Sequence, residues 1–325
     1  MTARRILAAL LVQLVAIPLF AQVLTATGKG VVVARDGQIE LRGRWKVEGV
    51  RHATSIVAGD DRVVVLDALN NEAVLADLAT GRTTRLRTAE TPVAAAFAGR
   101  ELYILARDAR VLQHVGGEST PLDPDPAFLR QADGRLYVYS RVTGVLQEIG
   151  GRRFTVGAFA SDLEISGRTA YLTYPRQGRI RTVALESGRI GEVAVGAVPV
   201  DLAFAGGGTA LSARLLAIAD PSAKRVWMTE GTQSTAEAVA RGFLRGLLGL
   251  GLFGSRDSQF PTGIDRVETR GGIWVAYDTS SGTLYHFTKK KSTVLARGVA
   301  PQAFAITATG VAWWNGTSVA EKRFR

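Results

Sequence analysis

The 325-residue chain contains no cysteine, only three histidines and two methionines. The lack of cysteine excludes disulfide bonds, a thiolate metal site, a covalently attached c-type haem, a thiol nucleophile and lipid attachment to an N-terminal cysteine. The histidines, His52, His114 and His286, share neither a metal-ligand spacing nor a common position in the repeat, so we expect structural or surface roles for them. A fold without disulfides must be held together by its core, and about 300 residues are enough to bury a large one.

The recognisable motifs of catalysis and nucleotide binding are missing as well. The sequence has no Ser-His-Asp arrangement, no phosphate-binding glycine loop and no dinucleotide fingerprint, and the glycine-rich run at 246–254 follows none of these patterns. RNA-binding and helix-turn-helix motifs are absent, so nucleic acid is not an expected partner. We therefore expect no cofactor and predict no catalytic residue.

What the chain does contain is a repeated phrase of about eight residues that opens a unit of short strands. The unit at 260–298 reads as four strands of about five residues, separated by turns rich in Gly, Asp, Ser and Pro. Openings of this kind begin at His52, Pro92, Pro126, Ala160, Pro199, Pro261 and Pro301. A period near about 37 residues with β-type strands is typical of a β-propeller.

Seven openings predict an all-β, seven-bladed β-propeller, or a six-bladed one if two openings share a blade. A four-stranded unit cannot bury both of its faces alone, so it needs neighbours like itself. The last unit ends after its third strand, whereas strand-like pieces at 31–34, 38–41 and 44–47 precede the first opening. We expect N-terminal strand material to complete the last blade, which would remove an open sheet edge. An irregular β-sandwich is the alternative.

The unit PTGI…GGIWVAYDTSSGTLYHF resembles the blades of NHL- and YVTN-type propellers and of related ring-forming periplasmic proteins. The likeness covers about residues 30–325 apart from one insertion, and it implies the propeller fold. Those families include lactonases, lyases, ligand-binding modules and scaffolds, so the resemblance carries no single function.

Residues 1–21 are typical of a secretory signal peptide. Arg4 and Arg5 provide a positive start, an apolar run covers 6–20, and Ala21 offers a small residue for cleavage. The run is short for a membrane span and is interrupted by Pro18, although an uncleaved N-terminal anchor is the alternative. We therefore expect a periplasmic or secreted protein whose propeller domain covers 22–325.

The chain is basic, with a formal net charge of +11, and many of its cations lie in expected turns. In an up-and-down blade, the turns after the first and third strands lie on the same side of the disc. The residues that we predict to contact an anionic surface there are Arg152, Arg153, Lys289, Lys290 and Lys291. The alternative is that these side chains only solvate the turns.

Residues 232–259 form a glycine- and leucine-rich insertion that we predict to be helical. Ser234 or Thr235 followed by Glu237 favours a helix start, and apolar residues then recur at helical spacing. The residues predicted to bind a partner are Val239, Phe243, Leu244, Leu247, Leu248, Leu252 and Phe253. The alternatives are a helix folded back on the propeller and a lid over its channel. We expect the insertion between an outer strand and the next inner strand, opposite the basic turns.

Acidic residues occupy matching positions in some of the openings. Asp162 and Asp201 take the third position, and Glu164 and Asp265 take the fifth. Because inner strands line the channel of a propeller, these acids could surround a cation, as the resemblance to lactonase-type propellers implies. The equivalent positions elsewhere are mostly apolar, which favours acids that cap strand ends or pair with nearby arginines.

These features together predict an exported, non-catalytic propeller that serves as a protein-binding or scaffolding module. Its expected partner is another protein of the cell envelope, contacted through the insertion helix, with the basic face as a second contact for an anionic surface or polymer. The alternative is a metal-assisted lactonase, hydrolase or lyase with its carboxylate site at Asp162, Glu164, Asp201 and Asp265.

Overall fold

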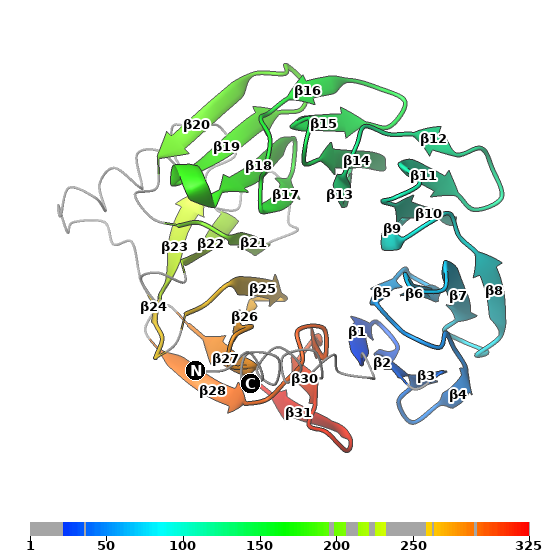
Figure 1. Ribbon diagram of the computed structural model, residues 1–325. Helices are drawn as coiled ribbons and strands as arrows, with labels where there is room; N and C mark the ends of the chain where they lie inside the picture. The colour runs from blue at the N-terminus through cyan, green and yellow to red at the C-terminus, as the bar shows by residue number, and fades with distance from the viewer. Residues whose placement is uncertain are drawn as a thin grey trace, which may run out of the picture.

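A computed structural model describes residues 22–35, 37–194, 198–205, 214–220, 225–231, 258–261, 263–288 and 291–324. The regular secondary structure of these residues consists of β-strands and one short 3-10 turn, η1 (Pro175–Gln177). In this part of the chain, no helix is long and apolar enough to cross a membrane. The strands form eight antiparallel sheets, which we number as blades 1 to 8 in chain order, and the blades are arranged as a ring (Figure 1).

The first half of the ring consists of blades 1 to 4. Blade 1 contains β1 (Val23–Thr27), β2 (Gly30–Arg35), β3 (Gln38–Leu41) and β4 (Trp45–Glu48). Blade 2 contains β5 (Ser55–Ala58), β6 (Arg62–Asp67), β7 (Glu72–Asp77) and β8 (Thr83–Arg87). Blade 3 contains β9 (Pro92–Ala98), β10 (Glu101–Ala106), β11 (Val111–His114) and β12 (Thr120–Pro121). Blade 4 contains β13 (Pro126–Ala132), β14 (Arg135–Ser140), β15 (Val145–Glu148) and β16 (Arg153–Thr155).

The second half consists of blades 5 to 8. Blade 5 contains β17 (Asp162–Ser166), β18 (Thr169–Tyr174), β19 (Arg179–Ala184) and β20 (Ile190–Ala194). Blade 6 contains β21 (Asp201–Ala205), β22 (Arg214–Asp220), β23 (Arg225–Gly231) and β24 (Ser258–Gln259). Blade 7 contains β25 (Arg266–Arg270), β26 (Ile273–Asp278), β27 (Thr283–Phe287) and β28 (Ser292–Ala296), and blade 8 contains β29 (Phe304–Ile306), β30 (Gly310–Trp314) and β31 (Val319–Arg323).

The core lies between neighbouring blades rather than inside any one of them. The second strand of a blade is buried on both faces, as in β6 and β26, because each face packs against the next sheet. One apolar cluster joins Val275 of blade 7, Val311 of blade 8 and Val33 of blade 1. Such packing satisfies the requirement that a small sheet find a neighbour on either side.

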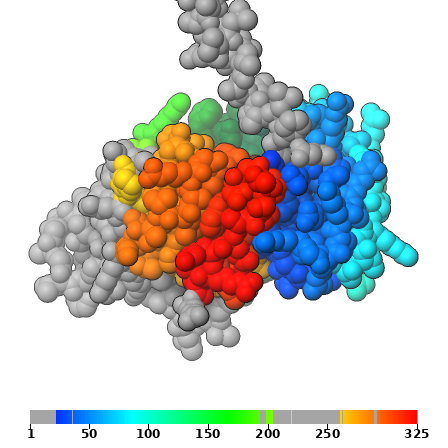
Figure 2. Space-filling model, turned by 90° about the horizontal axis from the view of Figure 1, so that it is seen from below, coloured from blue at the N-terminus to red at the C-terminus, as the bar shows by residue number. Residues whose placement is uncertain are grey.

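The ring closes by direct packing of blade 8 against blade 1. Inner strands of successive blades contact one another around the whole ring, and β29 contacts β1. The backbone N–H of Leu24 donates to the carbonyl of Gln302 over 2.9 Å, and Arg270 Nη1 donates to the carbonyl of Ala26 over 2.7 Å. Figure 2 shows the last blade, in red, lying against the first, in blue.

The all-β propeller fold is confirmed, but the expected seven blades closed by an N-terminal strand are not found. The described residues form eight sheets, since the three N-terminal pieces are β2, β3 and β4 of a complete blade. The strand that completes it, β1, follows directly on the predicted signal peptide and carries no opening phrase. Blade 8 has three strands in the described chain, and Glu321, Lys322 and Arg323 are exposed on its edge strand β31, where charge discourages pairing with another chain.

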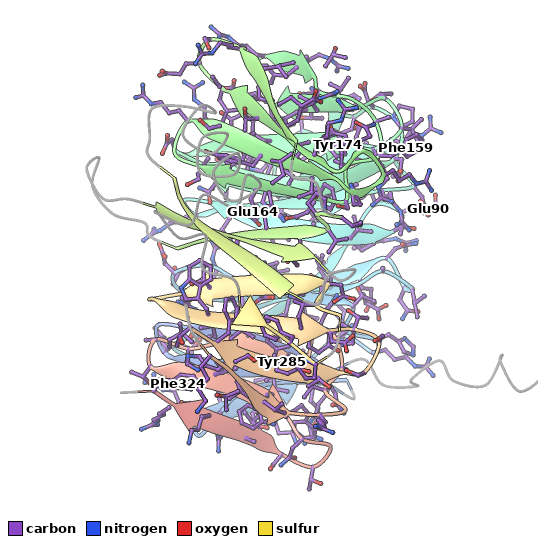
Figure 3. The ribbon with its side chains drawn as sticks, turned by 90° about the vertical axis from the view of Figure 1, so that its left-hand side faces the viewer. Glu90, Phe159, Glu164, Tyr174, Tyr285 and Phe324 are labelled. Carbon is purple, nitrogen blue, oxygen red and sulfur yellow. The ribbon has the colours of Figure 1, made fainter. Side chains whose placement is uncertain are left out.

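The two faces of the disc carry different connections. The turns after the first and third strands lie on one face, which we call the arginine face. The turns after the second strands and the connections between blades lie on the other, which we call the connection face. In the edge-on view, Phe159 and Glu90 mark the connection face and Phe324 marks the arginine face (Figure 3).

The position expected for the insertion was wrong. Ser258 pairs with Val226 and Gln259 with Arg225, so the outer strand of blade 6 follows the insertion. The chain therefore leaves β23 at Gly231, which pairs with Arg214 at the arginine face. Residues 232–257, with the predicted helix and its partner-binding side chains, lie outside the described residues, as do the predicted signal peptide, Lys289 and Lys290.

Truncation of Val33 tests whether blade 1 is a full member of the ring. Val33 is 3% exposed and packs in the core shared with blades 7 and 8. We expect Val33→Ala to lower the free energy of unfolding by about 2 kcal/mol in urea titrations, because it leaves a cavity in a shared core. The control is Val294→Ala at a 40% exposed site on β28, which should change stability by less than about 0.5 kcal/mol. Equal effects of the two substitutions would show that blade 1 does not close the ring.

Candidate functional site

The strand registers align the inner strands residue by residue. Asp162 pairs with Thr173, the residue before the last one of β18, and Asp201 pairs with Ala219 at the equivalent place in blade 6. In blade 7 the same place is held by Arg266, which pairs with Tyr277. A second set of equivalent positions lies two residues further along each inner strand. It is occupied by Arg130 in blade 4, Glu164 in blade 5, Ala203 in blade 6 and Glu268 in blade 7.

Charged side chains on the inner strands are confined to four consecutive blades, 4 to 7. They include the six residues that we call the channel cluster: Arg130, Asp162, Glu164, Asp201, Arg266 and Glu268. The inner strands of blades 8, 1, 2 and 3 carry only apolar, hydroxyl and proline residues. One half of the channel wall is therefore charged and the other half is not.

Arg130 lies at the centre of the channel cluster. Its Nη2 is 3.3 Å from Asp162 Oδ1 and 3.2 Å from Glu164 Oε1. The side chain of Asp162 is 8% exposed, whereas those of Arg130 and Glu164 are 32% and 33% exposed. In blade 7, Arg266 forms an ion pair with Glu268. The cluster therefore has a buried side at Asp162 and a solvent-accessible side at Glu164.

The two aspartates hydrogen-bond the inner strand of the following blade. The backbone N–H of Leu202 donates to Asp162 Oδ2 over 3.1 Å, and that of Val267 donates to Asp201 Oδ2 over 2.6 Å. Each donor directly follows the residue at the equivalent aspartate position of its own blade. The same inter-blade bond is thus made twice in succession, and it explains why Asp recurs at this position.

The cluster favours protonated carboxyl groups. Burial raises the pKa of Asp162, and burial together with the charge of Asp162 raises that of Asp201. Burial raises the pKa of Glu164 to about 7, against the opposing effect of Arg130. Although burial disfavours the guanidinium charge, the surrounding carboxylates raise the pKa of Arg130. Three acids around one arginine leave excess negative charge, which is relieved by proton uptake near neutral pH.

Three of the four predicted channel acids come together, and Asp265 does not. Its Oδ1 accepts hydrogen bonds from Thr279 N, at 3.1 Å, and Thr279 Oγ1, at 2.9 Å, so it stabilises a turn. The inner strand of blade 7 begins at Arg266, later than the opening phrase suggested, and Glu268 takes the expected place. In the residues that the structure describes, no three acids or histidines have an arrangement suited to a metal ion.

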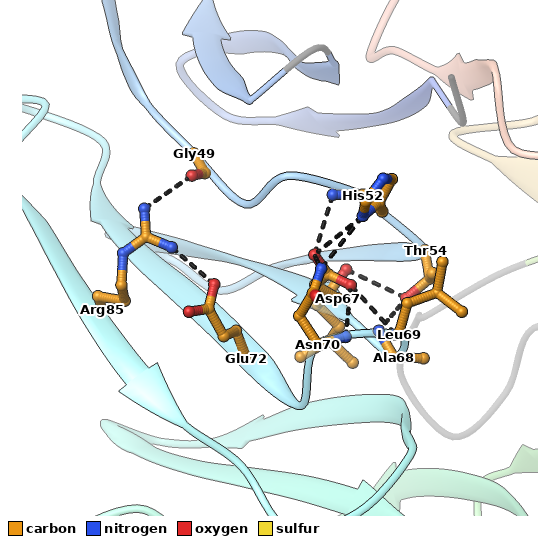
Figure 4. A network of polar contacts seen from close by, with 10 residues as sticks. Gly49, His52, Thr54, Asp67, Ala68, Leu69, Asn70, Glu72 and Arg85 are labelled. Atoms are coloured by element: carbon orange, nitrogen blue, oxygen red, sulfur yellow. Dashed lines mark hydrogen bonds and ion pairs between the residues drawn. The ribbon is translucent and has the colours of Figure 1, made fainter. Parts of the chain in front are cut away.

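The three histidines occupy separate structural contexts. The N–H of His52 donates to Asp67 Oδ2 over 2.9 Å, and the fully buried Asp67 also accepts from the N–H groups of Leu69 and Asn70 (Figure 4). His114 stacks on Tyr103 in blade 3 at 4.6 Å between ring centroids. His286 stacks on Phe324 at 3.9 Å, and burial lowers the pKa of His286.

The predicted anionic-surface arginines are engaged within the protein. Arg153 Nη2 lies 2.6 Å from Asp123 Oδ2, and Arg152 donates to the carbonyl of Glu186. Lys291 is exposed. The ion pair with Asp123 offsets the charge of Arg153, whereas the bond of Arg152 to a neutral carbonyl leaves its charge uncompensated.

A cleft of about 410 Å³ opens on the arginine face between blades 4 and 5. It is lined by Ala132, Asp133, Arg135, Tyr137, Glu148, Arg152, Gly167, Arg168, Leu185 and Glu186. Arg135 and Glu148 form an ion pair of 2.5 Å in blade 4, and Arg168 and Glu186 form one in blade 5. The aromatic residue of the lining is Tyr137, which is 3% exposed. The sequence analysis did not predict the cleft. The pattern that could have indicated it is an arginine and a glutamate near the turns of two consecutive units, Arg135 with Glu148 and Arg168 with Glu186.

Comparison with known proteins identifies the fold alone. No family model matches the chain, and no curated protein matches it. Among solved structures, it is similar to the dihydro-haem d1 dehydrogenase NirN in complex with DHE (TM-score 0.65, 11% identity, covering 92% of this chain and 69% of that one). It is also similar to the Cps50 (Swd1) β-propeller domain of Myceliophteria thermophila (TM-score 0.57, 12% identity, 82% and 96% covered). A third is the Pan2 WD40 domain of Neurospora crassa (TM-score 0.53, 10% identity, 79% and 84% covered).

These neighbours confirm the resemblance to β-propeller repeat proteins at the level of the fold. They include both an enzyme and propeller domains of other kinds. Because their sequence identity to this chain is so low, no function can be inferred from them. The NHL or YVTN character of the repeat stays a prediction.

Replacing Glu164 tests the charge balance of the channel cluster. Because the folded-state pKa is raised from its usual 4.5 to about 7, the folded state binds more protons than the unfolded state in that interval. This group therefore makes stability fall as pH rises from about 4.5 to about 7. We expect Glu164→Gln to flatten the decrease in melting temperature between pH 5 and pH 8, measured by differential scanning fluorimetry.

The matched control is Glu118→Gln, at an exposed turn residue outside the channel, which should leave the pH profile unchanged. An unaltered profile in Glu164→Gln would contradict the raised pKa.

Proposed function

We propose that this protein is an exported, non-catalytic propeller that binds another protein of the cell envelope through its arginine face. The observation that carries the proposal is the cleft between blades 4 and 5 on that face. The chain leaves for the insertion from Gly231 of the neighbouring blade 6, on the same face. The two elements predicted to dock a partner, the basic turns and the insertion, therefore start from one surface.

The chemistry of the cleft suits a peptide segment that carries charges of both signs. Its ion pairs remain largely accessible on the arginine side, where Arg135 and Arg168 are 64% and 70% exposed. A guanidinium group has five donors, so a single carboxylate partner leaves several free for a second acceptor. Glu186 is 65% exposed and can accept from an incoming ammonium or guanidinium group. The volume lies within the range of sites that enclose a ligand or side chain.

A metal-assisted hydrolase or lyase is the second candidate, and one observation favours it. Glu164, in the channel, has a pKa of about 7, and perturbed groups in cavities are frequent at catalytic sites. The hydrogen bonds of Asp162 and Asp201 to the next blade favour a structural role for these acids instead. We therefore rank the binding module first.

Substitution of Asp201 separates the two candidates. If it is an inter-blade acceptor, Asp201→Ala leaves the Val267 N–H unpaired and should cost about 2 kcal/mol of unfolding free energy, whereas Asp201→Asn, which keeps an acceptor oxygen, should restore most of it. Melting curves with and without excess Ca²⁺ or Zn²⁺ provide the second measurement. A metal-induced rise in the wild-type melting temperature that disappears in Asp201→Asn would support the hydrolase candidate.

Capture experiments from the native host test the binding module. We expect a cell-envelope protein that is recovered by the wild type and lost from the double variant Arg135→Glu/Arg168→Glu and from a deletion of 235–256. The control is Arg85→Glu, which also breaks an arginine–glutamate ion pair, with Glu72, but lies on the outer strand of blade 2. Recovery of the same proteins by all variants, with folding verified by melting curves, would show that the arginine face does not dock them.

A further inference from the structure

Exposed large hydrophobic residues concentrate on the connection face. In the described chain, Leu69, Val142, Phe159 and Val198 are 74%, 53%, 60% and 38% exposed, and all four lie in turns after second strands or in connections between blades. The two others with comparable exposure, Ile190 and Val294, lie on outer strands β20 and β28. The four residues are spread from blade 2 to the start of blade 6, so they are distributed over several blades of one face.

Phe159 is held in a conformation that a phenylalanine rarely adopts. Its φ is 64°, and the equivalent residues before β9 and β13, Thr91 and Asp125, have φ of 58° and 54°. The blade connection thus requires a left-handed residue here, a position in which a bulky side chain is uncommon. Because the ring is 60% exposed, packing does not account for its presence. A strained, exposed aromatic residue indicates a contact outside the chain.

Phe159 and Val142 belong to adjoining segments of this surface. The N–H of Phe159 donates to the carbonyl of Arg141 over 2.9 Å, which brings the connection to blade 5 beside the turn that carries Val142. In Figure 3, Phe159 lies at the edge of the disc that carries Glu90 and points away from the core. The pair therefore forms a small apolar projection on this face.

The N-terminal end of the described chain lies on the same face. Val23, the first residue of β1, pairs with Ala34 near the end of β2, and the next residue, Leu24, bonds to Gln302 in the connection to blade 8. The described chain therefore starts on the connection face, directly after residues 1–21, which we predict to be a signal peptide or an N-terminal anchor.

Exposed charge on the connection face is mainly positive. In the described turns and connections of this face, the exposed arginines are Arg51, Arg107, Arg110, Arg176 and Arg297, and the exposed acids are Glu90 and Asp108. Apolar side chains that project among arginines are the pattern of a protein surface that lies on anionic head groups.

We propose that the connection face rests on the surface of a lipid bilayer, with Leu69, Val142 and Phe159 inserted among the head groups. A protein partner would instead require a contiguous apolar centre, whereas these side chains come from separate blades. A planar surface can contact all of them together. This orientation turns the arginine face, with its cleft, away from the membrane.

The absence of cysteine allows a direct test with single labels on the full chain. Leu69→Cys and Val142→Cys, and the control substitutions Ile190→Cys and Val294→Cys, are each labelled with an environment-sensitive fluorophore. The protein is then added to vesicles that contain phosphatidylglycerol and a nitroxide-labelled lipid. We expect quenching at the two connection-face sites to exceed that at the controls by at least about twofold, because only the former enter the head-group region.

A second variant, Phe159→Asn, addresses Phe159 without straining the fold, since Asn tolerates the left-handed conformation better than Phe. It should retain or raise the melting temperature and reduce quenching of the label at residue 142. Equal quenching at all four sites, or protein that remains in the aqueous fraction, would overturn the proposal. Labels on the connection face that are shielded before vesicles are added would also overturn it, in favour of a second copy or another protein.

Discussion

The structure depends on the burial of both faces of each sheet against its neighbours. A four-stranded sheet of this size exposes apolar residues on two sides, and its second strand, as in β26, is buried throughout. The cluster that joins Val33, Val275 and Val311 shows that this demand is met even where the two ends of the chain meet. The ring must therefore close for the core to be buried. Blades 8 and 1 close it through shared apolar contacts and a few backbone hydrogen bonds, and in the described chain no N-terminal strand joins the last blade.

The inner strands of blades 4 to 7 carry charged side chains next to apolar residues of the core, and placing them there has a cost in desolvation. Asp162 and Asp201 offset that cost by accepting N–H groups of the next blade, and Arg130 partly neutralises the excess charge. Removing one partner of such a buried network costs more than the network contributes as a whole. The charged half of the channel therefore joins neighbouring blades, and the same burial that this role requires raises the pKa values of its acids. A perturbed pKa at this place is consequently weak evidence for catalysis.

Much of the fold followed from local patterns, whereas the relation between distant segments did not. Turn residues and alternating strands predicted β2, β3 and β4 and the blade fold itself. Strand β1 went unrecognised because it has no opening phrase and adjoins the predicted signal peptide. Glu268 was missed in favour of Asp265, since the start of β25 is set by its pairing with β26 rather than by Pro261. The cleft could not be foreseen from either blade alone, because Arg135 and Arg168 are brought together only by the packing of blades 4 and 5.

The two faces of the disc differ in how freely they can change. On the connection face, buried tyrosines fix the links between blades: Tyr139 and Tyr174 both donate to the carbonyl of Gly157, and Tyr277 donates to that of Val299. A change in length there would break these bonds and shift the next inner strand. On the arginine face, added residues between a third and an outer strand disturb only the outermost pairing, as between β23 and the two-residue β24. The rigid links of the connection face are compatible with the proposed contact with a flat membrane surface. The arginine face tolerates added residues, so a binding element can be inserted there without opening the ring.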